Sequence, residues 1–180
     1  MTLAPLVFVH GTHGQDDPWY VSTSPLATAA LAAGLELACR EPFRWSGEIG
    51  GLPVGLAPQA ADDPVQDRRL FTWAVEARHL VYYCHAARPP QQGRVQEVSL
   101  VAHSHGGAMA ILATAAYGLK VRHLITAATP VRNDLEPYCA EARRRIRGTW
   151  VHLYGDFWRD WWQKVGELFD GHVGWYREMP

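Results

Sequence analysis

The sequence lacks any apolar run as long as the roughly 18 residues that a membrane-spanning helix needs. It also lacks an excess of charge of one sign, since its formal net charge is −1. Near-neutrality gives no reason to expect a nucleic acid or an acidic surface as partner. Internal repeats and low-complexity tracts are absent as well. We therefore expect a globular protein without a membrane span.

Cysteine is scarce. The three cysteines, Cys39, Cys84 and Cys139, are odd in number and lie far apart, without the spacing of a metal site or a redox motif. The N-terminus has no basic stretch before its apolar residues, and those residues run directly into His10 and Gly11, which is not typical of a signal peptide. These features favour a reduced compartment and a cytoplasmic location.

The length bounds the architecture. A chain of 180 residues with 48% hydrophobic residues is long enough for one core and too short for a large inserted cap. Apolar strand patterns alternate with helical patterns along it. We therefore expect a single α/β domain over residues 1–180, with a doubly wound parallel sheet and helices on both faces.

The expected elements can be placed on the sequence. Strands are predicted, in the spatial order 2-1-3-4-5 for about five strands, at Leu6–His10, Leu35–Arg40, Val95–Ala102, Val121–Ala127 and Thr149–Tyr154. Helices are predicted at Pro25–Ala33, Asp63–Ala86, Gly106–Tyr117, Tyr138–Arg147 and in a Trp-rich segment that reaches Phe169. A long loop rich in Gly and Pro separates the second strand from the second helix, over residues 41–64.

Ser104 ends a β-branched apolar run and begins a helical pattern of small residues. This arrangement is typical of a nucleophile elbow, a strained turn that lifts a serine hydroxyl above the sheet. The positions two before and two after the serine must be small there, and Ala102 and Gly106 occupy them, so the motif is A-x-S-x-G rather than G-x-S-x-G. The alternative is a Gly-rich turn without chemistry.

A second glycine turn follows the first strand at His10-Gly11-Thr12. A tetrahedral intermediate needs backbone N–H donors for its oxyanion, one after the nucleophile and one from a loop after an early strand. Thr12 and His105 are the predicted donors, each through its backbone N–H. Turn chemistry alone would also account for these glycines.

Five short segments recur in the same order in a known family. They are Val9-His10-Gly11-Thr12, Phe43-Arg44-Trp45-Ser46-Gly47, His103-Ser104-His105-Gly106-Gly107, Ala128-Thr129-Pro130 and Gly171-His172-Val173-Gly174-Trp175. In this order the chain resembles bacterial lipase-like serine hydrolases of the α/β-hydrolase superfamily, over nearly its whole length. The resemblance implies a minimal α/β-hydrolase that cleaves carboxylic esters with a Ser–His–Asp triad.

The resemblance also implies which residues complete the triad, because the superfamily order is serine, then acid, then histidine. Of nine histidines, only His172 lies in a C-terminal loop, and we expect it to be the base. His123 and His152 fall within or beside strands and are expected to be structural.

The triad acid is open between two residues. Asp156 follows the last strand at the usual place, while Asp160 opens a segment similar to the family's Asp-x-x-Gln-x-x-Gly pattern, shifted by two residues. Asp160 is slightly favoured, although it is also placed to cap a helix. Asp170 ranks third because it is too close to His172 in sequence.

Two other functions are weighed against the esterase. A metal-dependent hydrolase is suggested by His10 with His13 and by His103 with His105, but both pairs lack the further ligands that zinc enzymes use. A non-catalytic binding module on a hydrolase fold would be expected to have lost the serine or the histidine. We therefore expect no metal and no cofactor, and a small-molecule or lipid-like ester as substrate; the oligomeric state stays open.

Aromatic residues gather in the expected loops around the site. Trp19 and Trp45 fall in the two loops predicted at the sheet edge of Ser104. At least half of the tryptophans are expected to be core packing, because tryptophan buries a large apolar area in any fold. The basic run Arg143–Arg147 lies where a helix should end, a place that favours cations.

Overall fold

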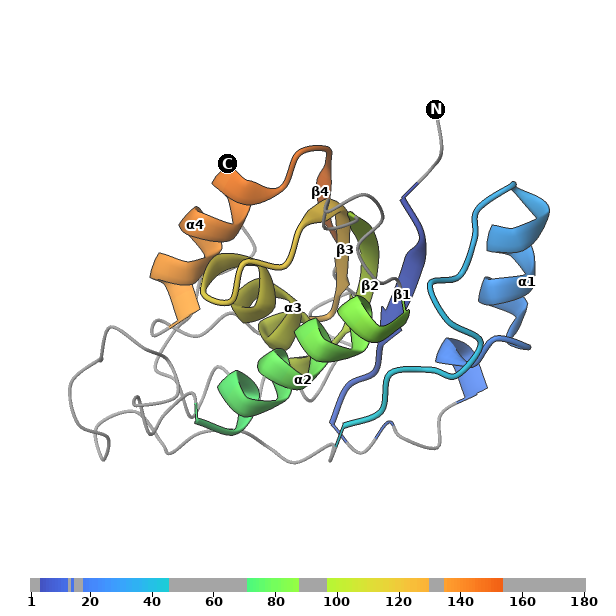
Figure 1. Cartoon of the computed structure of the whole chain (residues 1–180), viewed down its shortest axis with the longest axis horizontal. Coiled ribbons are helices and arrows are strands. Elements are labelled where there is room, and N and C mark those ends of the chain that lie inside the picture. Colours follow the sequence, from blue (N-terminus) through green and yellow to red (C-terminus); the bar gives the residue numbers. More distant parts are fainter. Residues whose placement is uncertain are drawn as a thin grey trace, which may run out of the picture.

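A computed structural model describes residues 4–12, 14, 18–45, 71–87, 97–129 and 135–153. Within these residues a parallel sheet has the strand order β1-β2-β3-β4. Its strands are β1 (Leu6–Val9), β2 (Val98–His103), β3 (Val121–Ala127) and β4 (Trp150–Leu153). The helices are η2 (Pro18–Tyr20), α1 (Pro25–Ala32), α2 (Phe71–Ala87), α3 (His105–Ala115) and α4 (Glu136–Arg145). Parallel strands with intervening helices make this an α/β fold (Figure 1).

The strand predicted at Leu35–Arg40 is reduced to a single bridge, between Leu37 and Leu6. Leu6 donates its N–H to Glu36 at 2.7 Å and accepts from Ala38 at 2.9 Å. The segment therefore lies beside β1, where the predicted strand order puts it, but it pairs at one residue only. The sheet has four strands in the described residues, and five strands with helices on both faces remain a prediction.

Local signals position α1 as predicted. The Ser24 hydroxyl accepts a hydrogen bond from the Ala27 N–H at 3.0 Å, which caps the first turn, and Pro25 is the first helical residue. Gly34 follows the helix with a φ of +82°, a left-handed conformation that glycine adopts without strain.

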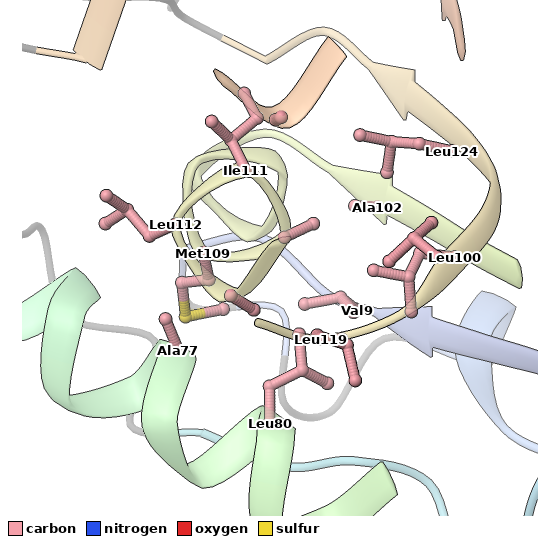
Figure 2. Close-up of a cluster of buried hydrophobic side chains, with 14 of the residues drawn as sticks. Val9, Ala77, Leu80, Leu100, Ala102, Met109, Ile111, Leu112, Leu119 and Leu124 are labelled. Carbon is pink, nitrogen blue, oxygen red and sulfur yellow. The ribbon is translucent and has the colours of Figure 1, made fainter. Parts of the chain in front are cut away.

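The core is built around α3. Every residue of this helix from Gly106 to Ala115 is buried, and Figure 2 shows Met109, Ile111 and Leu112 of α3 lying among side chains of the strands and of α2. No helix in the described ranges is both long and apolar enough to cross a lipid bilayer. The apolar character of α3 instead reflects its central place in the core.

The buried face of α2 differs in part from the predicted one. The apolar spacing of the sequence predicts one face with Leu70, Ala74, Ala77, Val81 and Cys84. Ala74, Ala77 and Cys84 are buried, Val81 is half-buried, and Leu70 lies outside the described residues. Trp73 and Leu80 are also fully buried, although the sequence pattern did not single them out. A period of 3.6 residues leaves neighbouring positions near the edge of an apolar face, so the final choice is made by packing.

A smaller cluster lies around the other side chains of β1. Leu6 and Phe8 pack with Tyr20, Ala27 and Ala30. Val7 and Val9, the alternate residues of the strand, belong to the large cluster around α3. The period of two in β1 thus divides its side chains between the two clusters.

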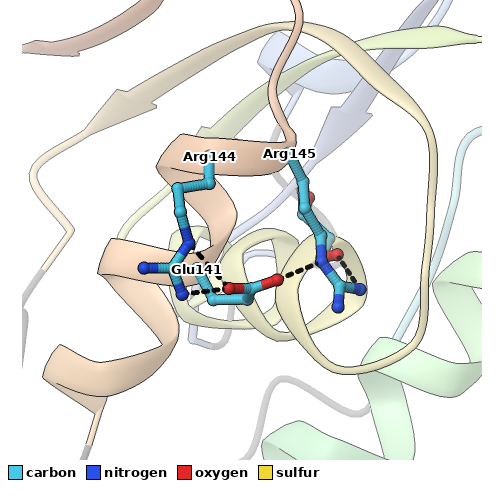
Figure 3. Close-up of polar contacts among 4 residues, drawn as sticks. Glu141, Arg144 and Arg145 are labelled. Atoms are coloured by element: carbon cyan, nitrogen blue, oxygen red, sulfur yellow. Dashed lines mark hydrogen bonds and ion pairs between the residues drawn. The ribbon is translucent and has the colours of Figure 1, made fainter.

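Three arginines of the basic run around the end of α4 pair with acidic neighbours. Arg144 donates to Glu141 through Nε at 3.0 Å, and Arg145 donates to the same carboxylate at 2.5 Å (Figure 3). The hydrogen bond from Arg144, with that from Arg145, holds the pKa of Glu141 below its ordinary value. Arg147 pairs with Glu97 at 2.6 Å. These pairs favour the interpretation of the run as a solvated helix end.

Candidate active site

Ser104 occupies a strained turn between β2 and α3. Its φ of 52° and ψ of −133° lie outside the regions that non-glycine residues normally adopt. The Ser104 N–H donates to Ala127 O at 2.8 Å, and the Ser104 carbonyl accepts from the Gly107 N–H at 2.9 Å. The turn is therefore held on one side by β3 and on the other by the first turn of α3, so a strained strand-to-helix turn lies where the sequence predicts an elbow.

Gly106 meets the steric demand that the elbow pattern predicted. A Cβ at this position would lie 2.4 Å from His10 O and 2.7 Å from Val9 O, both of them backbone atoms at the end of β1. The helix after Ser104 thus approaches β1 so closely that only glycine fits.

Gly11 brings the loop after β1 against the serine. A Cβ at Gly11 would lie 2.7 Å from Ser104 Cβ and 3.2 Å from His103 O. The predicted oxyanion loop and the predicted nucleophile are therefore in direct contact, although 93 residues separate Thr12 from His105.

The side chains of the two predicted oxyanion donors bond to each other. Thr12 Oγ1 and His105 Nδ1 form a hydrogen bond. The His105 ring also lies over Trp73, with ring centroids 5.0 Å apart. His105 is the first residue of α3, and the N–H groups of a first helical turn, with the positive end of the helix dipole, favour a developing negative charge.

His10 is a buried residue of this loop whose role the sequence analysis missed. Its Nδ1 lies 2.8 Å from Gly11 O, and the Trp45 N–H donates to its Nε2 at 3.2 Å. Sequence spacing had considered His10 only as a metal ligand with His13. One feature of the sequence could have indicated this role: His10 stands directly before the Gly-Thr turn, between a buried strand and the loop.

The tryptophans predicted at this edge of the sheet have different surroundings. Trp45 is 5% exposed and stacks on His10, so it is core packing. Trp19 is half-buried and meets the His103 ring edge to face, with centroids 6.0 Å apart. Of the two, only Trp19 has surface left to contact a ligand.

The Ala128-Thr129 segment packs against the elbow. A Cβ at Gly107 would lie 2.0 Å from Thr129 Oγ1, so this residue of α3 must also be glycine. Ala128 has a φ of 48° and donates its N–H to Leu153 O at 2.8 Å. The chain leaving β3 is thereby held between α3 and β4.

The remaining predicted triad residues, His172, Asp156 and Asp160, lie outside the described residues, as does Asp170. The register of the sheet shows where the chain stands before these four residues. His103 pairs with Ala127, and Ala127 pairs with Leu153. The described part of β4 therefore ends at Leu153, on the sheet edge that carries Ser104.

Cys84 and Cys139 do not compete with Ser104 as nucleophiles. Burial raises the pKa of the Cys84 thiol to about 12, and burial also raises the pKa of Cys139 to about 12. A thiol with such a pKa carries almost no thiolate at neutral pH. Within the described ranges no three metal-ligating side chains come together, and His13 lies outside them.

Comparison with known proteins indicates no function for this chain. No protein family matches the chain, and no curated protein is significantly similar to it. What the described residues establish is an α/β fold with a parallel sheet, in which a strained serine, a helix N-terminus and a glycine loop meet at the end of β2.

Proposed function

We propose that the protein is a serine hydrolase that cleaves carboxylic esters through an acyl-enzyme. The observation that carries the proposal is the conformation of Ser104, whose φ of 52° is sustained directly before α3. Strain of this kind persists only where the surrounding structure imposes it, and it clusters at active sites. The contact between Gly11 and Ser104 supports the same proposal, since an oxyanion hole requires a loop of this kind beside the nucleophile.

The proposed reaction assigns each group a step. Ser104 Oγ attacks the ester carbonyl while its proton passes to His172, and the N–H groups of Thr12 and His105 stabilise the oxyanion. Collapse of the intermediate expels the alcohol, which takes the proton from His172. Water then attacks the acyl-enzyme in the same way and releases the acid. Asp160 or Asp156 orients the imidazole of His172.

The finer architecture belongs to the same proposal. It is a minimal α/β-hydrolase of about five parallel strands, with helices on both faces and without a large cap. The Leu37 bridge beside β1 supports a further strand at that edge. The reaction needs no cofactor, and the substrate is a small-molecule or lipid-like ester.

Replacing Ser104 tests the proposal. Ser104→Ala should lower the hydrolysis of p-nitrophenyl esters by about 10³-fold or more and should abolish labelling by a fluorophosphonate probe, because both depend on Oγ. Ser99→Ala, on the same strand, is the matched control and should keep activity and labelling. An unlabelled wild-type protein would favour a binding module instead. Activity that survives in Ser104→Ala but is lost to chelators would favour a metal-dependent hydrolase.

A further inference from the structure

The peptide between Gly11 and Thr12 needs an external constraint if Thr12 is to serve as an oxyanion donor. Gly11 must be glycine because a Cβ there would lie 2.7 Å from Ser104 Cβ. A glycine leaves its own backbone torsions almost unrestricted. This peptide turns about ψ of Gly11, which glycine leaves almost free, and about φ of Thr12, which threonine keeps negative. The direction of the Thr12 N–H can therefore change over part of a turn at little local cost.

The hydrogen bonds around His10 define its protonation state. The Trp45 N–H donates to Nε2 at 3.2 Å, so Nε2 is an acceptor and carries no proton. A neutral imidazole then holds its proton on Nδ1, which lies 2.8 Å from Gly11 O and donates to it.

Gly11 O is held from a second direction as well. The Gly14 N–H donates to this oxygen at 3.0 Å. None of the described peptides is cis, and in a trans peptide the C=O and the N–H point in opposite directions. Holding Gly11 O towards His10 and Gly14 therefore directs the Thr12 N–H away from them.

His10 is itself immobilised. Its side chain is fully buried, and its carbonyl accepts from Trp45 Nε1 at 2.8 Å. The imidazole contacts two aromatic rings, with centroids 4.9 Å from Tyr20 and 5.4 Å from Trp45. A side chain held by two rings and at both nitrogens can act as a rigid support for the peptide that it bonds.

We propose that His10 is a positioning residue that locks the Gly11–Thr12 peptide in the orientation in which the Thr12 N–H stabilises the oxyanion. The proposal rests on the esterase function proposed above. His10 touches neither the substrate nor Ser104 in this role. It acts through Gly11 O, and its neutral Nδ1–H form is the one that the lock requires.

Two substitutions separate the donor at Nδ1 from the acceptor at Nε2. His10→Asn leaves an amide N–H near the position of Nδ1, where it can still donate to Gly11 O. His10→Gln puts its amide near the position of Nε2, where it can still accept from Trp45 but cannot reach Gly11 O. Both remove the ring stacking, so their melting temperatures should fall by similar amounts. A difference in kcat between the two variants then reports on the hydrogen bond to Gly11 O.

The expected result is a loss of kcat confined mainly to one variant. His10→Gln should lose about 10-fold to 100-fold in kcat for a p-nitrophenyl ester with little change in KM, approaching the cost of removing an oxyanion donor. His10→Asn should keep a kcat close to that of wild type. Equal losses in both variants, or an unchanged kcat in His10→Gln, would overturn the proposal.

A second readout does not depend on activity. In ¹H–¹⁵N spectra of the protein without substrate, the Thr12 amide should give one sharp signal in wild type and in His10→Asn. In His10→Gln it should be broadened or doubled, because the peptide then samples two orientations. If wild type shows neither turnover nor fluorophosphonate labelling, the proposed function fails, and the lock is judged by this signal alone. A sharp, unshifted Thr12 signal in His10→Gln would overturn it.

Discussion

Ser104 holds a backbone conformation that costs free energy, and the cost belongs to the residue rather than to its hydroxyl. A non-glycine residue in a sparsely populated region of φ and ψ is destabilised by about 1–3 kcal/mol. Alanine has a Cβ and carries the same penalty, whereas glycine does not. Substitutions of Ser104 should therefore affect activity through the hydroxyl and stability through the backbone conformation.

Ser104→Gly should be more stable than Ser104→Ala, by roughly 1 kcal/mol. Both variants lack the nucleophile and should be inactive, so the comparison isolates the backbone strain at φ 52°. The measurement is the free energy of unfolding of each variant in denaturant. Equal stabilities, or a less stable glycine variant, would show that the turn is not strained in solution.

At the scale of elements, the site depends on two segments that are far apart in the sequence and that follow the neighbouring strands β1 and β2. The loop after β1 and the first turn of α3 are connected by the hydrogen bond between Thr12 Oγ1 and His105 Nδ1. His105 is supported in turn by Trp73 of α2. A link between the two donors fixes their relative position before substrate binds, which is what preorganised stabilisation of an oxyanion requires.

Thr12→Val should weaken catalysis because valine keeps the shape of threonine but cannot hydrogen bond to His105. Loss of a hydrogen bond worth about 1 kcal/mol corresponds to a decrease in kcat of about fivefold. Thr12→Ser keeps the hydroxyl and is the matched control, with kcat expected near that of wild type. The assay is hydrolysis of a p-nitrophenyl ester at saturating substrate. Similar losses in both variants would instead assign the effect to packing of the threonine methyl group.

At the scale of the whole molecule, the sequence predicted the features that local chemistry determines. β3 has the predicted bounds, and α1 begins after its capping residue Ser24 and ends before Gly34 as expected. The contact of Gly11 with Ser104 agrees with the proximity that the two glycine motifs indicated. Each of these features follows from a short run of residues with a specific backbone requirement.

Features that depend on distant partners were not predictable in the same way. Leu35–Arg40 has a strand-like composition, yet it pairs with β1 at Leu37 only. The role of His10 depends on Trp45, which is 35 residues away and bonds to it at two points. Composition cannot reveal such contacts, because a buried histidine and a metal-ligating one look alike in a sequence.

His152 makes the stability of the whole fold depend on pH. It lies on β4, is half-buried, and its Nδ1 lies 2.9 Å from Thr126 Oγ1. Burial lowers the pKa of His152 below its ordinary value of 6.5. The folded state therefore resists protonation of this imidazole, while the unfolded state does not.

The sign of the effect follows from that difference. Well above pH 6.5 the imidazole is neutral in both states and has no effect on stability. As the pH falls below this value the unfolded state binds a proton first, so the free energy of unfolding decreases until the folded pKa is passed. His152→Asn removes the titrating group, and the decrease between about pH 6.5 and pH 5 should become shallower than in wild type. Denaturant unfolding of both proteins across this range measures it. Parallel pH profiles would show that the β4 strand leaves His152 as accessible to protons in the folded state as in the unfolded one.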